Sequence, residues 1–133
     1  MSVSLAEVGW IAGLVEGEGC IIVRPQSNTL RLSIEMTDLD VLQKAARLFG
    51  PTARLSQRTI KLPNPKHKPR YILHLTGSPM MQWLMTIYSF MGVRRKQKIE
   101  DAIRMFKARR NRPSHGAPGR HRATQYIEHE GVK

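Results

Sequence analysis

The sequence has little cysteine, few acids and no long hydrophobic run. Its single cysteine, Cys20, excludes an internal disulfide and is typical of a reducing compartment, and its apolar neighbours predict a small core residue. The most apolar segment, residues 80–91, is too short to span a bilayer. Residues 1–5 lack the charged start and apolar stretch of a secretory leader. We therefore expect no membrane partner and an intracellular location, in a bacterial or phage-host cytoplasm or an organelle.

Acidic residues are scarce and unevenly placed. The chain has 10 Asp and Glu against 22 Lys and Arg, which gives a formal net charge of +12. No acid lies between Val41 and Ile99, a stretch that is rich in bases. This distribution predicts a polyanionic partner. A nuclease typically has many basic residues that bind phosphates and a few acidic residues that bind a metal ion. The alternative, a ribosomal or chromatin-like binder, would not need the glycine pattern described below.

Hydrophobic periodicity predicts a single domain with the order αββαββα and an extra C-terminal helix. The expected elements are a helix that ends near Gly19, strands at 20–24 and 30–36, a helix at 38–49, strands at 53–58 and 70–75, and helices at 78–91 and 96–108. Four antiparallel strands would carry helices on one face and a polar, basic surface on the other. Residues 109–133 lack apolar periodicity, so we expect a disordered basic tail after a domain of residues 1–108.

Three glycines recur at helical spacing near the start of the chain. Gly9, Gly13 and Gly17 line one stripe of a helix, and each costs about 0.5–1 kcal/mol relative to alanine. This cost indicates close approach by a second helix. Glu16 and Glu18 fall in the last turn, where the helix dipole disfavours negative charge. A helix–helix contact that ends in carboxylates predicts a metal site at an interface. The alternative is a buried glycine-rich helix with a solvated acidic end.

Residues 11–19, IAGLVEGEG, resemble the LAGLIDADG signature of homing endonucleases, with Glu at both acidic positions and Gly17 in place of Ala. The order of the expected elements is also that of this family, and the resemblance covers about residues 7–108. It implies an α+β, αββαββα fold with a four-stranded antiparallel saddle sheet and helices on one face. A single motif implies a homodimer, with an interface that contains Gly9, Ala12, Gly13, Glu16 and Gly17.

The resemblance also implies a metal centre on the two-fold axis, where the Glu18 side chains of both protomers meet. Two close carboxylates need a counter-charge, and hard oxygen ligands favour Mg²⁺ as the cofactor. Glu18 corresponds to the metal-binding acid of the motif, Gly17 supplies a backbone carbonyl, and Glu16 ties down the helix end. A bound metal can activate water and stabilise charge on the phosphate. The alternative for Glu18 is a solvated glutamate at a helix end.

Two further residues match positions that order water near the scissile phosphate in single-motif relatives. Asp38 falls at the end of the second strand, and Lys96 shortly before the last helix. Both are therefore catalytic candidates along with Glu18. The alternatives are a helix N-cap for Asp38 and a phosphate contact for Lys96, with Lys98 or Arg95 in its place if the register shifts.

The polar face of the sheet is expected to lie in the major groove of double-stranded DNA, which admits β-ribbons. Arg can bind guanine, Gln and Asn can bind adenine, and Glu35 can accept a hydrogen bond from cytosine. Lys66, Lys68 and Lys98 are expected to contact phosphates. The alternative is a solvated sheet face. The residues expected on this face are Arg24, Gln26, Asn28, Arg31, Ser33, Glu35, Arg54, Ser56, Arg58, Arg70, Ile72 and His74.

Together, the pattern and the resemblance predict a homodimeric, Mg²⁺-dependent homing endonuclease that breaks both strands of a long pseudo-palindromic site by phosphodiester hydrolysis. The family is encoded in introns, inteins or free-standing mobile genes. Two alternatives stay open: a non-cleaving DNA-binding regulator, and a maturase that binds its host intron RNA. Glu18 argues against the regulator, since a binder needs no acid that faces phosphates. A basic sheet serves DNA and RNA equally.

Overall fold

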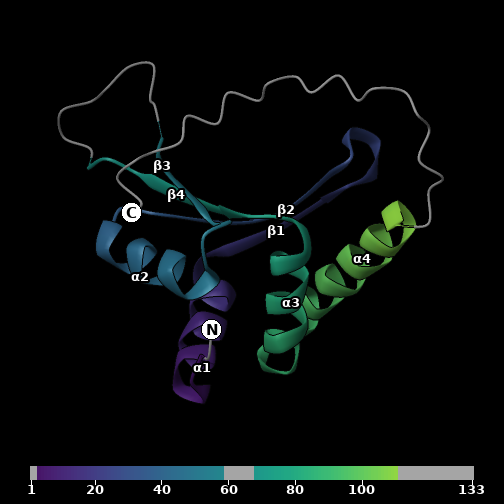
Figure 1. Ribbon diagram of the computed structural model, residues 1–133, viewed down its shortest axis with the longest axis horizontal. Helices are drawn as coiled ribbons and strands as arrows, with labels where there is room; N and C mark the ends of the chain where they lie inside the picture. Colours follow the sequence, from purple (N-terminus) through teal and green to yellow (C-terminus); the bar gives the residue numbers. More distant parts are fainter. Residues whose placement is uncertain (1–2, 59–67, 111–133) are drawn as a thin grey trace.

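The computed structural model describes residues 3–58 and 68–110 (Figure 1). This part of the chain forms four α-helices and one four-stranded antiparallel sheet, which confirms the predicted α+β class. The strand order is β1-β2-β4-β3, and Figure 1 shows the helices gathered below the sheet, on one side of it. The elements are α1 (Leu5–Glu18), β1 (Gly19–Arg24), the 3-10 turn η1 (Pro25–Ser27), β2 (Thr29–Met36), α2 (Leu39–Phe49), β3 (Arg54–Gln57), β4 (Tyr71–Leu75), α3 (Gly77–Ile87), the 3-10 turn η2 (Tyr88–Phe90) and α4 (Val93–Arg110).

The first helix has defined ends. Ser4 and Glu7 form a capping box, in which Ser4 Oγ accepts from the Glu7 amide at 3.1 Å and Glu7 Oε1 accepts from the Ser4 amide at 2.9 Å. At the other end, Gly19 is extended and begins β1. A Cβ at residue 19 would lie 2.6 Å from the Val15 carbonyl oxygen. Gly19 is thus needed for a close approach to the backbone of the preceding turn, and the helix ends there as expected.

One hydrophobic core lies between the sheet and the helices. Alternate strand residues such as Ile21, Leu32 and Leu73 point into it, and they meet Ile11 and Leu84 from the helices. The alternation sends the other strand residues to the opposite, polar face. Cys20 is one of them and is exposed, so its predicted place in the core is wrong. The reason is register: Gly19 and Ile21 are the buried residues at the start of β1.

Both C-terminal helices begin or end differently from expectation. Helix α3 begins at Gly77, one residue before the expected start, with Thr76 in the N-cap position, and it ends at Ile87 instead of residue 91. Helix α4 begins at Val93 and continues to Arg110, two residues beyond the predicted domain end. Residues 109 and 110 therefore belong to α4 and not to the expected tail, and residues 111–133, the rest of that prediction, lie outside the described residues. None of the helices in the described ranges is long and apolar enough to cross a membrane.

Candidate functional site

The glycine stripe of α1 is exposed. Gly9, Gly13 and Gly17 are all exposed, and a Cβ built on any of them would meet no atom of the described chain within 4 Å. At 100° per residue, Ala6 lies on the same face and is exposed as well. Nothing within the described residues therefore requires glycine at these three positions. Ala12, predicted to share this surface, is only 2% exposed and packs in the core, so its assignment to the interface is wrong.

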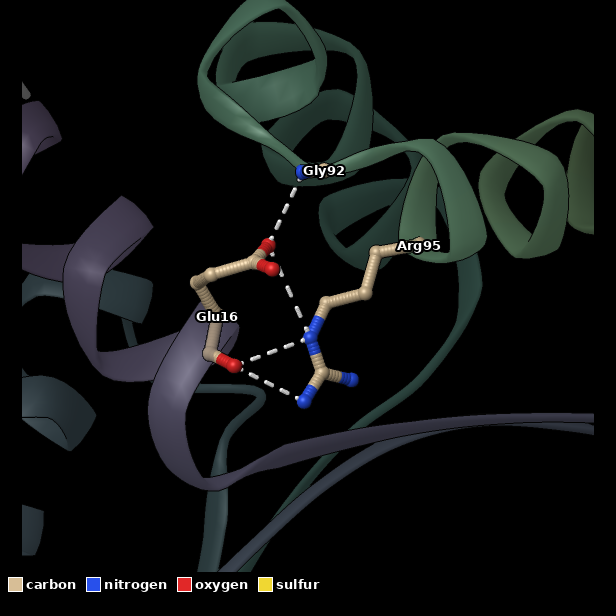
Figure 2. Close-up of polar contacts among 3 residues, drawn as sticks. All are labelled: Glu16, Gly92 and Arg95. Carbon is tan, nitrogen blue, oxygen red and sulfur yellow. Dashed lines mark hydrogen bonds and ion pairs between the residues drawn. The ribbon is translucent and has the colours of Figure 1, made fainter.

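Glu16 fastens the end of α1 to the junction of η2 and α4 (Figure 2). Its Oε2 accepts a hydrogen bond from the Gly92 amide at 3.1 Å and lies 3.7 Å from Arg95 Nε. Arg95 Nε and Nη2 also donate to the Glu16 carbonyl oxygen, at 3.1 and 2.9 Å. Arg95 thereby satisfies one of the last carbonyl groups of α1, which lack helical partners. The side chain of Glu16 is thus used within the protomer.

Glu18, by contrast, is exposed at the last position of α1, directly before the sheet begins. Gly17 precedes it, and its carbonyl group is among the last four of the helix, which have no intrahelical partner. A carboxylate and a backbone carbonyl are hard oxygen ligands, so the residues fit Mg²⁺. Within residues 3–58 and 68–110 no three His, Cys, Asp or Glu side chains are grouped to hold a metal ion. Mg²⁺ usually keeps several waters and needs only one or two carboxylates, so a second copy, a phosphate or water could supply further ligands.

The two predicted water-ordering residues lie on different helices. Asp38 is exposed and occupies the N-cap position of α2, but its side chain makes no capping hydrogen bond. Lys96 lies in the first turns of α4, with Nζ 5.4 Å from the ring centroid of Tyr88. Burial, and next the neighbouring Glu100, raises the pKa of Tyr88. Of the basic residues at the start of α4, Arg95 is the one that binds the end of α1.

The predicted polar face of the sheet forms rows of aligned residues. In one row Cys20, Ser33, His74 and Arg54 lie side by side across all four strands. The next row aligns Glu35, Ile72 and Ser56, and Arg31 pairs with Ile22. Arg24 ends β1, while Arg58 and Arg70 extend the β3–β4 pairing through a backbone hydrogen bond of 2.8 Å. The structure thus brings the predicted strand residues together on one surface.

The residues of this surface differ in their exposure to solvent. Ser33 is only 8% exposed, so a direct contact with a base, as predicted, is not open to it. Arg31 Nε and His74 Nε2 are buried and have no hydrogen-bond partner in the described chain. Burial, and to a smaller extent the charge of Arg31, lowers the pKa of His74 below its ordinary value. Both causes favour the neutral form of His74 on this arginine-rich surface.

Both carboxylate oxygens of Glu35 are already occupied. Oε1 accepts from Arg58 Nη1 at 2.5 Å, and Oε2 lies 3.4 Å from Arg70 Nη2. A carboxylate oxygen can accept more than one hydrogen bond, so the predicted hydrogen bond from cytosine to Glu35 would compete with these arginines without having to displace them. Sequence reasoning missed this cluster, because the three residues come from three strand ends that only the sheet brings together.

The β1–β2 turn is hydrogen-bonded to α4. Asn28 is in the left-handed region with φ 54°, and its Oδ1 accepts from Arg109 Nε at 2.8 Å. Arg109 Nη2 also donates to the Asn28 carbonyl oxygen. Asn28, Lys98 and Arg109 line a pocket of about 470 Å³ between this turn and α4. The side-chain oxygen of Asn28 is therefore bound by α4, and its predicted contact with a base would have to use the side-chain NH2 group or compete with Arg109.

The remaining predicted DNA-binding residues lie at the edges of this arrangement. Gln26 is exposed in η1, and Lys68 is exposed just before β4. Lys66 lies outside the described residues. Comparisons of the chain with protein-family models, with curated proteins and with solved structures found no match.

Proposed function

We propose that the chain is a homodimeric, Mg²⁺-dependent, site-specific DNA endonuclease with the homing-endonuclease fold. It would hydrolyse one phosphodiester in each strand of a long pseudo-palindromic site. The observation that carries the proposal is the exposed glycine stripe of α1, which ends in an exposed carboxylate, Glu18, at the start of the sheet.

The glycine stripe supports a dimer through its energetic cost. Gly9, Gly13 and Gly17 together cost about 1.5–3 kcal/mol relative to alanine. The described chain offers no contact that would explain this cost, because a Cβ at each position would lie in open space. A second α1 that packs closely against the stripe would explain it. A two-fold axis through this contact is the commonest arrangement of homodimers, and it would place both Glu18 residues at the centre.

The different environments of the two acids support a metal site at Glu18. Both acids are exposed in the last turn of α1, but Glu16 is tied to Gly92 and Arg95, whereas Glu18, two residues further on, is not part of this contact. Glu18 and the Gly17 carbonyl would hold Mg²⁺, which when bound supplies an activated water and charge stabilisation at the phosphate. Arg95 fixes the helix end on which these ligands lie. Lys96 and Asp38 remain the candidates for ordering the attacking water.

The polar face of the sheet supports a nucleic-acid partner. Its exposed members are mostly arginines, and the only acid among the aligned strand residues is Glu35. Arginines that contact phosphates give binding that weakens steeply as the salt concentration rises. The face opposite the core is free of helices in the described chain (Figure 1), so a duplex can approach it.

The test is cleavage of DNA from the gene's own locus, without the intron, in Mg²⁺ and in EDTA. We expect a double-strand break at one site in Mg²⁺, and we expect Glu18→Gln to abolish it while DNA binding is retained. Asp40→Asn removes an exposed acid of α2 and is the matched control, with cleavage unchanged. A wild-type gel shift without cleavage would favour the regulator, and faster splicing of the host RNA would favour the maturase. Absence of cleavage in Mg²⁺, with either of these results, would refute the endonuclease.

A further inference from the structure

Glu35 links two arginines on the polar face of the sheet. It lies on β2, whereas Arg58 follows β3 and Arg70 precedes β4. One oxygen accepts from Arg58 at 2.5 Å and the other lies 3.4 Å from Arg70. The side chain of Glu35 is 24% exposed, while those of Arg58 and Arg70 are 59% and 48% exposed. The acid is thus the inner member of the cluster, and both arginines reach outward from it.

Neither folding nor affinity for a polyanion explains this arrangement. Ion pairs with such exposed arginines contribute little to stability, because solvent screens them and ordering the side chains is unfavourable. A carboxylate on a DNA-binding face also repels phosphates and lowers non-specific affinity. What Glu35 does provide is a defined position for two long, flexible side chains. Each arginine keeps further N–H donors, since the guanidinium group has five.

We propose that Glu35 is a positioning residue for sequence discrimination, and that Arg58 and Arg70, held by it, form a prearranged pair for reading guanine. This inference rests on the proposed function. Guanine is the base whose O6 and N7 accept two hydrogen bonds from one arginine in the major groove. A guanidinium group held in place before binding loses less side-chain entropy on the correct base. The backbone bond from the Arg58 amide to the Arg70 carbonyl keeps the two arginines on adjacent strand ends, so they address neighbouring base pairs.

The test is selection of bound duplexes from a randomised library by the full chain and by three variants. These are the single variant Glu35→Gln, the double variant Arg58→Ala/Arg70→Ala, and the triple variant that carries all three substitutions. We expect the wild-type protein to select guanine at two neighbouring positions in each half-site. Glu35→Gln should reduce the preference at these positions roughly tenfold, with the other positions unchanged. In the double arginine variant, Glu35→Gln should cause no further change in base preference, because the arginines that Glu35 positions are absent.

Non-specific binding gives a second readout that a purely structural role would not change in the same way. Glu35→Gln should strengthen binding to unselected duplex and steepen its salt dependence, since one repulsive charge is removed. Asp40→Asn removes a charge from α2 and should alter neither the selected site nor the local preference. Thermal unfolding of Glu35→Gln should match that of the wild type, which excludes loss of fold as the cause.

The outcomes separate this inference from the proposed function. If the wild-type chain selects a site and Glu35→Gln keeps the full preference for guanine, the positioning role is refuted while the DNA-binding function stands. If Glu35→Gln still changes discrimination in the double arginine variant, Glu35 reads a base itself and the inference is wrong. If the wild-type chain selects no duplex sequence, both the proposed function and the inference fall.

Discussion

Arg95 donates two hydrogen bonds to the backbone carbonyl oxygen of Glu16, at 3.1 Å from Nε and 2.9 Å from Nη2. The two residues are 79 positions apart in the chain, and their contact joins the last turn of α1 to the first turn of α4. The carboxylate of Glu16 adds a bond to the Gly92 amide (Figure 2). The position of Glu18, two residues further on, therefore depends on α4.

Loss of this contact should affect both stability and catalysis. Arg95→Ala leaves a helix-end carbonyl and a carboxylate without their partner, and we expect the free energy of unfolding to fall by about 1–3 kcal/mol. Cleavage should slow at saturating DNA, because Glu18 is less well positioned. Arg94→Ala changes an exposed neighbour and is the matched control. Denaturant unfolding and single-turnover cleavage measure the two effects, and equal behaviour of both variants would contradict the role of Arg95.

Substitution of a glycine in the stripe should change protomer stability and dimer affinity in opposite directions. Gly13→Ala should stabilise the protomer by about 0.5–1 kcal/mol, because alanine favours the helix and its Cβ meets no atom. The same methyl group should weaken the dimer by holding the two α1 helices apart. Unfolding at low protein concentration and sedimentation equilibrium report these opposite changes. Gly19→Ala is the comparison: its Cβ would clash with the Val15 carbonyl oxygen, so the protomer itself should be destabilised. If the dimer affinity of Gly13→Ala equals that of the wild type, the stripe is not the dimer interface.

Arg109 should act on DNA binding from a distance. Arg109→Ala removes both hydrogen bonds to Asn28, and we expect about 1–2 kcal/mol lower stability together with weaker site-specific binding. The reason is that the β1–β2 turn, which carries Gln26, loses its support from α4. Arg110→Ala removes the same charge from the next, exposed residue and should only reduce the salt-dependent part of binding. A fluorescence-anisotropy titration at two salt concentrations distinguishes these results.

Stability should depend on pH through His74. Its pKa in the folded chain lies below the ordinary value of 6.5, because burial and Arg31 disfavour the charged form. The unfolded chain therefore takes up a proton near pH 6.5, while the folded chain does so only at lower pH. Between these values the free energy of unfolding falls as the pH is lowered. In His74→Gln this part of the pH dependence should be absent between pH 7 and 5. Parallel stability curves for both proteins would contradict the prediction.

The alternation of strand residues was sufficient to predict the polar face of the sheet. Arg31, Ser33 and Glu35 share a face because successive side chains in a strand point to opposite sides. The helices were predictable in the same way, from apolar residues at helical spacing. Cys20 was misplaced because its neighbours are all apolar, so the run shows no alternation, and only the pairing of β1 with β2 defines which side it takes.

The sequence by itself determined the α+β class, the order of the elements, the glycine stripe and the sheet residues that face away from the core. These depend on local periodicity, which any stretch of about ten residues carries. Only the tertiary structure decided that Glu16 is bound by Arg95 while Glu18 is left exposed, that Glu35 joins Arg58 and Arg70, and that Arg109 supports Asn28. Each of these contacts joins residues at least 23 positions apart, so it depends on how the elements pack and not on the residues next to it in the chain.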